Sequence, residues 1–253
     1  MKYKFIFLIL SCSKLDKDNI YYNSCNKYTF FKEKNKLYYD LFKDNIKFFF
    51  VEYNNDINQE IVEDGDFIYI KGNEEPIIPN LLLKKIIAIN YIYSKYAYEY
   101  MIHTNLSSLW NIPVLFTLYN NIPKTRFFGG HFIFNSFITG TGIIVSNDLT
   151  PLLLKIREIK QTMNEDVAIS RFMISNNTPI YHLENLKNYK LNYQILDENE
   201  TDINSMHHKN NNLEINENTN TDDILYFRIR SSKNERDIFV AKNILKKLYN
   251  IVT

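Results

Sequence analysis

The chain has 253 residues, of which 45% are hydrophobic, so it is long enough and apolar enough to bury the core of one substantial domain. Its 30 Lys and Arg residues nearly balance its 29 Asp and Glu residues, which excludes a global field that draws the protein to nucleic acid or to an acidic membrane. Its 2 cysteines cannot build a disulfide framework, and they fit a reducing compartment.

The N-terminal residues predict a buried strand. The basic start followed by apolar residues 5–10 imitates a signal peptide, but this apolar core is shorter than the roughly 7–15 residues that such a segment needs. Residues 4–11 are instead typical of a central parallel strand buried on both faces. The polar loop after it would touch the ligand of a nucleotide-binding sheet, which makes candidates of Cys12, Ser13 and Lys14. No other stretch approaches the roughly 18 apolar residues of a membrane span, so none is expected.

Strands and helices alternate along the first half of the chain. Residues 80–96 carry apolar residues at helical spacing, with Lys84 and Lys85 leaving the apolar stripe, and they form the longest predicted helix. The other elements predicted in this half are a helix over 37–42 and strands over 46–53, 67–70, 98–103 and 113–118, with a turn at 64–66. This order predicts an α/β protein built on a doubly wound sheet.

A polar loop follows the strand predicted over residues 98–103. In open α/β sheets the chemistry usually lies just past the carboxyl end of such a strand, which makes Thr104, Asn105 and Ser107 candidate site residues. The alternative is that these residues and Ser108 only make a turn or cap a short helix.

Glycines punctuate the second half of the chain. Four of the six lie in Gly129-Gly130-His131 and Thr139-Gly140-Thr141-Gly142, where the backbone must turn tightly or be closely approached. Asn147 or Asp148 is predicted to cap a helix over 152–159. The other elements predicted here are strands over 143–146, 179–183 and 224–230, a helix from 164–166 through 173, and an amphipathic helix over 237–252. Residues 185–223 are polar and aperiodic, so one domain spanning residues 1–253 is predicted to carry a mobile insert there.

Three motifs occur in a fixed order. Tyr98-Glu99-Tyr100 leads into Thr104, then Gly140 and Gly142 precede Ser146, Asp148 and Leu149, and Glu165-Asp166-Val167 comes last. This order resembles the β1,3-galactosyltransferase and Fringe family of GT-A-fold glycosyltransferases, and Asn80-Leu81 with Lys84 resembles a further motif of that family. The resemblance covers about residues 48–183. It implies a GT-A-like fold, which is a Rossmann-like mixed sheet flanked by helices, and transfer of a sugar from a nucleotide-sugar donor to a glycan or glycoprotein.

The chain departs from this family in the loop that holds the metal. Where the family has three acidic residues, this chain has Asn105-Leu106-Ser107, so the carboxylates that would hold Mn²⁺ or Mg²⁺ against the nucleotide diphosphate are absent. An Asn amide can still bond a ribose hydroxyl, but a neutral Ser is a poor ligand for a hard dication. Either catalysis was lost, or cations of the protein neutralise the diphosphate and no metal cofactor is expected.

Basic residues gather where the last predicted strand ends, at Arg228, Arg230, Lys233 and Arg236. Guanidinium groups suit bidentate phosphate binding, so Arg228 and Arg230 are predicted to bind the donor in a metal-independent enzyme. The alternative is a solvated charged turn.

The resemblance implies that Asp166 is the catalytic base of an inverting transfer, because the family places the base at the second acidic residue of Glu-Asp-Val. Such a carboxylate takes the proton from the acceptor hydroxyl as that hydroxyl attacks the anomeric carbon. The alternative is that Asn164, Glu165 and Asp166 only stabilise a helix N-terminus. The residues predicted to contact the acceptor or sugar are Gly140, Thr141, Gly142 and Glu165. The residues predicted to contact the donor are Cys12, Ser13, Lys14, Lys84, Thr104, Asn105, Ser107, Arg228 and Arg230.

The histidines carry a weaker signal. His131, His182 and His207-His208 have no metal-binding spacing with acidic partners, and His103 at a strand end is expected to be a satisfied core or rim group. His182 is the best candidate for a contact with the diphosphate, by its position after the Glu165-Asp166 helix.

Three hypotheses about function follow. The first is a glycosyltransferase without a membrane span, expected in the cytoplasm. The abundance of Asn, Ile and Lys indicates an AT-rich genome, such as that of a large DNA virus, a protist or a low-GC bacterium; a viral enzyme is expected in the host cytoplasm or virion. The second is a catalytically inactive glycan- or protein-binding module on the same fold. The third is a generic nucleotide-binding protein, which is ranked last because neither Gly-x-Gly-x-x-Gly after the first strand nor Gly-Lys-Ser/Thr occurs.

Overall fold

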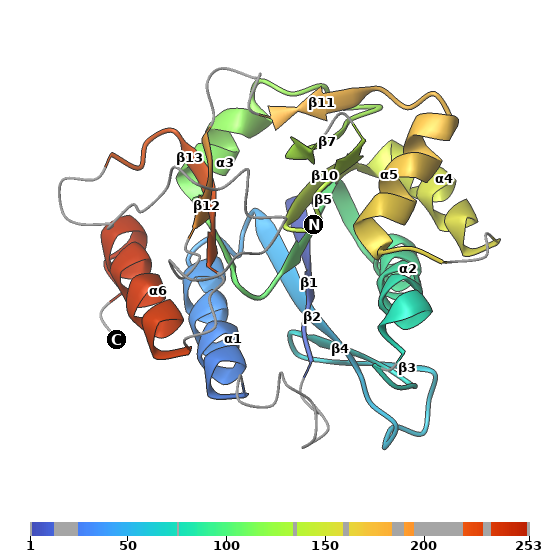
Figure 1. Ribbon diagram of the computed structural model, residues 1–253, viewed down its shortest axis with the longest axis horizontal. Helices are drawn as coiled ribbons and strands as arrows, with labels where there is room; N and C mark the ends of the chain where they lie inside the picture. The colour runs from blue at the N-terminus through green and yellow to red at the C-terminus, as the bar shows by residue number, and fades with distance from the viewer. Residues whose placement is uncertain are drawn as a thin grey trace. The chain divides into compact units, whose positions relative to one another are not determined.

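The computed structural model describes residues 2–12, 25–74, 76–133, 136–158, 162–183, 190–194, 220–229 and 234–251 (Figure 1). Two compact units divide the chain, and each is described by itself. Unit 1 comprises Met1–Ser13, Phe42–Asn105 and Ile122–Leu186, and unit 2 comprises Lys14–Leu41, Leu106–Asn121 and Lys187–Thr253. The single domain expected from the sequence stays a prediction.

Unit 1 is built on an eight-stranded mixed sheet with the strand order β11-β7-β10-β5-β1-β2-β4-β3. Its strands are β1 (Lys2–Leu10), β2 (Ile46–Tyr53), β3 (Ile61–Asp64), β4 (Phe67–Ile70), β5 (Ala97–Asn105), β7 (Phe128–Gly130), β10 (Gly142–Ser146) and β11 (Ile180–His182). β1 runs parallel to its neighbours β2 and β5, whereas β10 runs antiparallel to β5 and β7. The α/β class and the Rossmann-like mixed sheet flanked by helices are therefore confirmed.

β1 is the central strand that the sequence predicts. Residues 5–9 are at most 1% exposed. Alternate side chains of a strand point to opposite faces, so a continuous apolar run is what a strand covered on both faces requires. The same logic explains β2, whose bounds agree with the prediction. β3 was not predicted; it pairs with β4 across the turn at Gly65, whose φ of 58° suits glycine.

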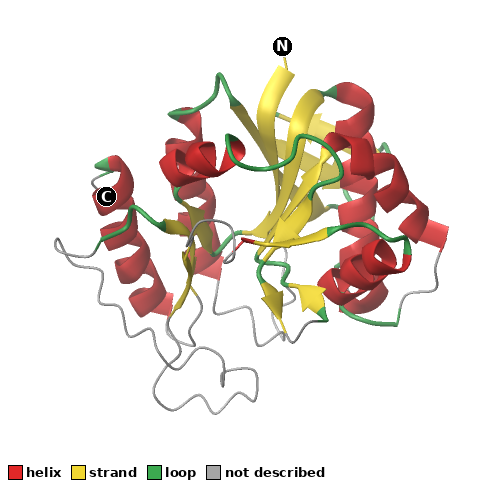
Figure 2. Ribbon diagram, turned by 90° about the horizontal axis from the view of Figure 1, so that it is seen from above, coloured by secondary structure: helices red, strands yellow, loops and turns green. Residues whose placement is uncertain are grey.

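Three helices lie together against one face of this sheet: α2 (Ile77–Lys95), α4 (Thr150–Leu154) and α5 (Glu165–Ser175) (Figure 1, Figure 2). α2 buries Leu82, Ile86 and Ile89 to 3% exposure or less, and each such side chain contributes about 1.5–3 kcal/mol. The prediction that Lys84 and Lys85 leave the apolar stripe is wrong, because both are buried to 1% exposure or less. Each of them meets a carboxylate, which is what permits a lysine to lie there.

The described part of the helix predicted over 152–159 is helical but broken into short pieces, the end of α4 and a 3₁₀ helix. η2 (Asn147–Leu149) and η3 (Lys155–Glu158) are 3₁₀ helices on either side of α4. Neither Asn147 nor Asp148 caps α4, which is preceded by Leu149, so that prediction is wrong. Asp148 accepts hydrogen bonds from Ser146 Oγ at 2.6 Å and from the Arg126 backbone N–H at 2.9 Å instead, which holds the turn after β10.

Unit 2 combines three helices with a three-stranded sheet of order β12-β13-β6. Its elements are α1 (Cys25–Asp40), β6 (Ser108–Trp110), α3 (Ile112–Tyr119), β12 (Lys190–Gln194), β13 (Ile224–Ile229) and α6 (Asn234–Tyr249). α1 and α6 are joined by a buried ion pair between Lys27 Nζ and Asp237 Oδ2 at 2.8 Å. The predicted last strand and C-terminal helix are confirmed, and α1 begins well before the residues predicted for it.

The strand predicted over 113–118 is wrong, because these residues belong to α3. Asn111 is its N-cap, and the Asn111 side chain accepts a hydrogen bond from the Val114 N–H at 3.4 Å. Pro113 occupies the first turn, where its missing N–H costs nothing. These two start signals override the β-branched and aromatic composition of the segment.

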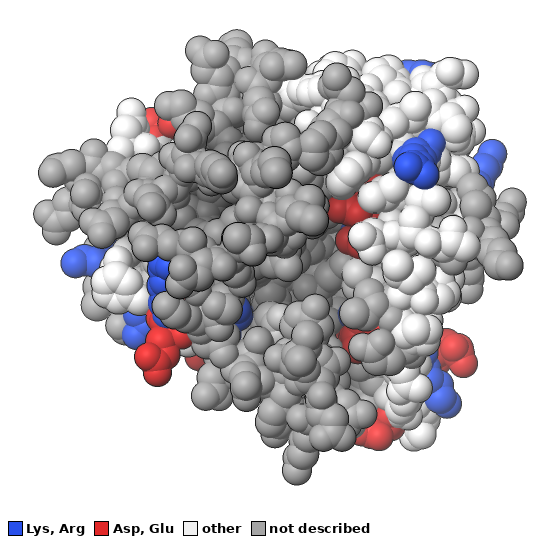
Figure 3. All heavy atoms as spheres, in the orientation of Figure 1, with Lys and Arg blue, Asp and Glu red and all other residues white. Residues whose placement is uncertain are grey.

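Part of the segment predicted as a mobile insert forms β12, which pairs in parallel with β13 and was not predicted. Residues 195–219 lie outside the described residues, so the mobility of the insert stays a prediction. Within the described ranges, no helix has the length and apolarity to cross a bilayer. On the face drawn in Figure 3, described basic and acidic side chains are interspersed, in agreement with the balanced charge of the chain.

Candidate active site at the carboxyl edge of the unit 1 sheet

The sheet of unit 1 changes winding direction between β1 and β5. From β1 the strand order continues through β2 and β4 on one side, and from β5 through β10 and β7 on the other. In open α/β sheets, ligands bind at the carboxyl end of the strands at such a switch point. The parallel register pairs Leu10 with Asn105 there, and Cys12 follows β1 in a half-buried position. Three predicted donor contacts, Cys12, Thr104 and Asn105, are thus brought to one edge of the sheet.

The loop formed by residues 139–142 is fastened to the same edge. Antiparallel pairing of β10 with β5 places Gly142 opposite Thr104. The Thr104 hydroxyl, 1% exposed, donates to the Thr141 carbonyl at 2.7 Å, and the Thr139 and Thr141 hydroxyls lie 2.7 Å apart. Thr104 therefore holds the loop against β5.

Asp166 lies against this loop from the first turn of α5. Its Oδ2 accepts a hydrogen bond from the Gly140 N–H at 3.0 Å, and its Oδ1 accepts from the Val167 N–H at 2.8 Å. The second contact is of the kind expected from a carboxylate at a helix N-terminus, but the first joins α5 to the edge of the sheet. Asn164, at the N-cap, makes no capping hydrogen bond with its side chain. The structure thus gives Asp166 a position at the switch-point edge as well as a place in the helix.

The surroundings of Asp166 favour a proton acceptor. Burial and then the adjacent Glu165 carboxylate raise the pKa of Asp166 above its ordinary value, and the Gly140 N–H and the Lys85 ammonium oppose this in part. A carboxylate with a raised pKa is a stronger base, and its pKa lies closer to neutral pH, where general bases are most effective. Perturbed carboxyl groups of this kind concentrate at functional sites.

Glu165 and Lys85 form a buried ion pair beside Asp166. Lys85 Nζ lies 3.3 Å from Glu165 Oε1, and their side chains are 0% and 13% exposed. Gly140 leaves room for this carboxylate, because a Cβ atom at Gly140 would lie only 2.8 Å from Glu165 Oε1. The close backbone approach predicted for the glycine-containing loop is confirmed at Gly140.

His103, on β5, is fully buried, and neither of its ring nitrogens has a hydrogen-bond partner in the described part of the chain. The expectation that His103 is a satisfied core group is therefore wrong. Burial and then the nearby Lys85 ammonium hold the pKa of His103 well below its ordinary value, so the ring is neutral. His182 ends β11, half-buried, and its ring packs edge-on against Phe132 with centroids 4.5 Å apart.

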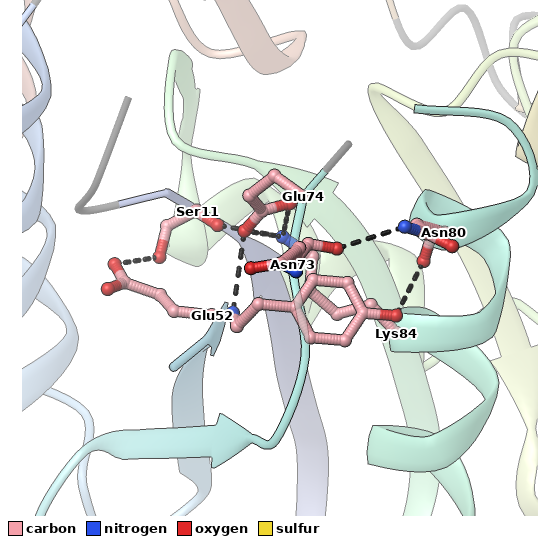
Figure 4. A network of polar contacts seen from close by, with 7 residues as sticks. Ser11, Glu52, Asn73, Glu74, Asn80 and Lys84 are labelled. Atoms are coloured by element: carbon pink, nitrogen blue, oxygen red, sulfur yellow. Dashed lines mark hydrogen bonds and ion pairs between the residues drawn. The ribbon is translucent and has the colours of Figure 1, made fainter. Parts of the chain in front are cut away.

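A second polar network involves the ends of β1 and β2 (Figure 4). Lys84 Nζ donates to both carboxylate oxygens of Glu74 at 2.7 Å and to the Ser11 carbonyl at 3.0 Å. The Ser11 hydroxyl donates to Glu52 Oε1 at 2.6 Å, and both residues are at most 6% exposed. Lys84, predicted to contact the donor, thus braces the segment that delivers Cys12.

Ser107 and Arg228, both predicted donor contacts, meet within unit 2. Arg228 Nη1 donates to Ser107 Oγ at 2.5 Å, and the pairing of β13 with β6 places Arg228 opposite Ser108. The resemblance implies a divalent cation at this loop, but the group found on Ser107 is itself a cation. An Asn amide and a hydroxyl bonded to guanidinium do not fit a hard dication, which requires several free oxygen ligands. Elsewhere in the described residues, no group of three or more His, Cys, Asp or Glu side chains could hold a metal.

Several predicted residues remain outside the described residues, namely Ser13, Lys14, Arg230, Lys233, His207 and His208. No protein-family model matches the chain, and no curated protein matches it. The case for a function therefore rests on the motifs and on the geometry above.

Sequence reasoning missed Lys85, the pair of Ser11 and Glu52, and the buried state of His103. Lys85 lies three residues after Leu82 and four before Ile89, which is the spacing of one helical face. Its position on the apolar stripe was therefore readable from spacing, although its charge argues against burial.

Proposed function

We propose that the protein is an inverting glycosyltransferase that moves a sugar from a nucleotide-sugar donor to a hydroxyl of a glycan or glycoprotein, with Asp166 as the base. The observation that carries this proposal is the Asp166 carboxylate, which is fixed by the Gly140 N–H at the switch-point edge and has a raised pKa. The order of motifs that resembles the GT-A-fold β1,3-galactosyltransferase and Fringe family supports the same assignment.

In this mechanism the acceptor oxygen attacks the anomeric carbon of the donor. The bond from that carbon to the diphosphate oxygen breaks, the diphosphate leaves with the electron pair, and Asp166 takes the proton of the acceptor hydroxyl. Proton transfer to a positioned group contributes typically 10²–10⁴-fold to a rate. The Gly140 N–H fixes Oδ2, so the carboxylate is already oriented when the acceptor arrives.

We propose that the donor binds at the ends of β1 and β5, with Cys12 and Asn105 as contacts. Buried Glu52 and Lys84 keep the end of β1 in position through Ser11. This arrangement follows the general location of nucleotide sites in α/β sheets. We assign the charge of the leaving diphosphate to Arg228 and Arg230 in place of a metal, as the missing acidic triplet and the basic end of the last strand suggest in the sequence.

The second candidate is a catalytically inactive glycan- or protein-binding module on the same fold. The observation that favours it is the replacement of the acidic triplet by Asn105-Leu106-Ser107. An inactive module has no use for a base, so Asp166→Asn should leave its ligand binding intact.

The test is a binding screen of UDP-, GDP- and TDP-sugars, followed by transfer and donor-hydrolysis assays in excess EDTA. Binding of one donor, turnover in EDTA and loss of turnover in Asp166→Asn are expected. Arg228→Ala should slow turnover about 10²–10³-fold, by analogy with removal of one transition-state hydrogen-bond donor. Failure of every donor to bind contradicts the proposal, and turnover that needs Mn²⁺ while Arg228→Ala has no effect contradicts the metal-independent mechanism.

A further inference from the structure

Lys85 is a buried cation that the proposed mechanism does not use. Its side chain is 0% exposed, and Glu165 Oε1 at 3.3 Å is its one hydrogen-bond or ion-pair partner in the described residues. A buried ammonium with one long contact is costly, and replacing a buried ion pair with apolar residues often leaves stability unchanged or higher. The pair is therefore not explained by stability alone.

His103, a buried titratable group on the sheet, offers Lys85 no hydrogen bond or opposite charge within the described residues. His103 lies between Leu8 of β1 and Ile143 of β10 in the strand register. Both ring nitrogens lack partners in the described residues, and the ring is neutral because burial and Lys85 lower its pKa. The Lys85 charge consequently acts on the carboxylates of α5.

Space is limited around Glu165 Oε1. Gly140 presents a bare backbone to this oxygen, and the same residue donates its N–H to Asp166 Oδ2. Lys85 and Gly140 thus both contact the Glu165 carboxylate, while Asp166 keeps its own hydrogen bond to the loop. Among described residues, the charged or titratable groups around Asp166 are Glu165 on its own helix, Lys85 on α2 and, beyond Lys85, His103 on β5; residues 139–142 add none.

We propose that Lys85 is a positioning residue for proton transfer: it holds Glu165 through the buried ion pair and thereby sets the charge beside Asp166. This inference rests on the proposed function, because it concerns the same base. The two carboxylates on adjacent residues repel each other, and the buried Lys85 ammonium decides how strongly that repulsion acts on Asp166.

The proposal predicts an order among three variants. Lys85→Met removes the cation and leaves the repulsion, so the acidic limb of the kcat/KM profile moves to higher pH. Glu165→Gln removes the repulsion, so the limb moves to lower pH. The double variant removes both and returns the limb towards that of the wild type. The double variant also leaves no unpaired buried charge, so it remains testable where Lys85→Met alone fails to fold.

Turnover gives a second measure. In Lys85→Met we expect kcat to fall about 10- to 100-fold, as expected for a catalytic group displaced by up to 1 Å, while the KM for the donor stays close to the wild-type value. The matched control is Lys95→Met, which removes another Lys–Glu pair from the same helix, that of Lys95 Nζ and Glu63 Oε2 at 2.7 Å. Lys95→Met should leave the pH profile unchanged.

A measurement that needs no substrate separates this inference from the proposed function. The Asp166 carboxyl carbon is titrated by NMR in the wild type and the three variants. We expect the pH midpoint of this titration to be lower than that of the wild type in Glu165→Gln, near it in the double variant and higher in Lys85→Met. This order supports the coupling even if no donor is turned over and the proposed function fails. Equal Asp166 titrations in all four proteins overturn it and leave Lys85 and Glu165 a purely structural pair.

Discussion

Gly140→Ala tests the candidate site by adding a methyl group beside the carboxylates without changing any charge. The φ angle of Gly140 is outside the left-handed region, so alanine is permitted there by its backbone. The added Cβ would lie 2.8 Å from Glu165 Oε1, whereas ordinary contacts begin at 3.4 Å, so that carboxylate must retreat by about 0.6 Å. Lys85 is paired with the same Glu165 oxygen, and Asp166 Cβ lies 3.4 Å from the new atom, so we expect the displacement to reach Asp166 as well.

The expected cost in stability is about 1–3 kcal/mol, which is typical of overpacking by one methyl group in a closely packed region. Turnover should fall by roughly 10- to 100-fold, because a misplacement of 1 Å in a catalytic group can cost about a hundredfold. The assay is donor turnover at saturating acceptor, with chemical denaturation alongside.

Gly65→Ala is the matched control for this prediction. Gly65 has a φ of 58° and no atom within 4 Å of its hypothetical Cβ, so alanine is strained there but touches nothing. We expect it to lose about 1–2 kcal/mol of stability with unchanged turnover. Wild-type turnover in Gly140→Ala, with the same loss of stability in both variants, would refute the placement of Gly140 beside the reacting groups.

Three further predictions concern buried polar groups. Asp166→Asn should be more stable than the wild type at neutral pH. The pKa of Asp166 is raised in the folded protein, so the wild type loses stability as the pH rises through the titration of Asp166. Chemical denaturation of the two proteins should give converging stabilities below about pH 3.9, the ordinary pKa of Asp. Identical pH dependence of the two proteins would contradict this. His103→Leu should leave the free energy of unfolding unchanged or higher, since a buried group without a partner costs about 1–3 kcal/mol; a marked loss of stability in urea would show that the ring has a partner beyond the described residues. Lys27→Met should cost about 3–5 kcal/mol by removing the cation from the buried Asp237 carboxylate, and Lys27→Met with Asp237→Asn should recover much of that loss; equal stability of Lys27→Met and the wild type would contradict this.

The sheet could be predicted wherever the apolar pattern is continuous. β1, β2 and β5 have runs that only a doubly covered strand explains, and these three strands define the switch point. α3 could not be predicted in this way, because Ile112–Tyr119 is rich in strand-forming residues and its helix depends on two residues at its start. Short strands such as β6 are determined by pairing with distant segments, which leaves little signal in their own sequence.

The candidate site was predicted in part. The motif order led to Gly140, Glu165 and Asp166, and the structure brings these residues together. Lys85 was missed because charge was taken to exclude burial, and only the fold shows that Glu165, eighty residues later, compensates that charge. The hydrogen bond between Arg228 and Ser107 was not predicted, because neither composition nor spacing could indicate it.

The distribution of unfavourable features in unit 1 is itself an argument about function. Sequences that fold well satisfy their local rules nearly everywhere, and the exceptions gather where function demands them. Around the end of β5 this chain combines a carboxylate with a raised pKa, a second carboxylate beside it, a lysine with no exposure and a histidine without partners in the described residues. The core on this face of the sheet is otherwise formed by a cluster of hydrophobic side chains, which would serve a purely structural purpose better. These costly groups gather at the carboxyl edge at β5, which supports the proposal that Asp166 acts there.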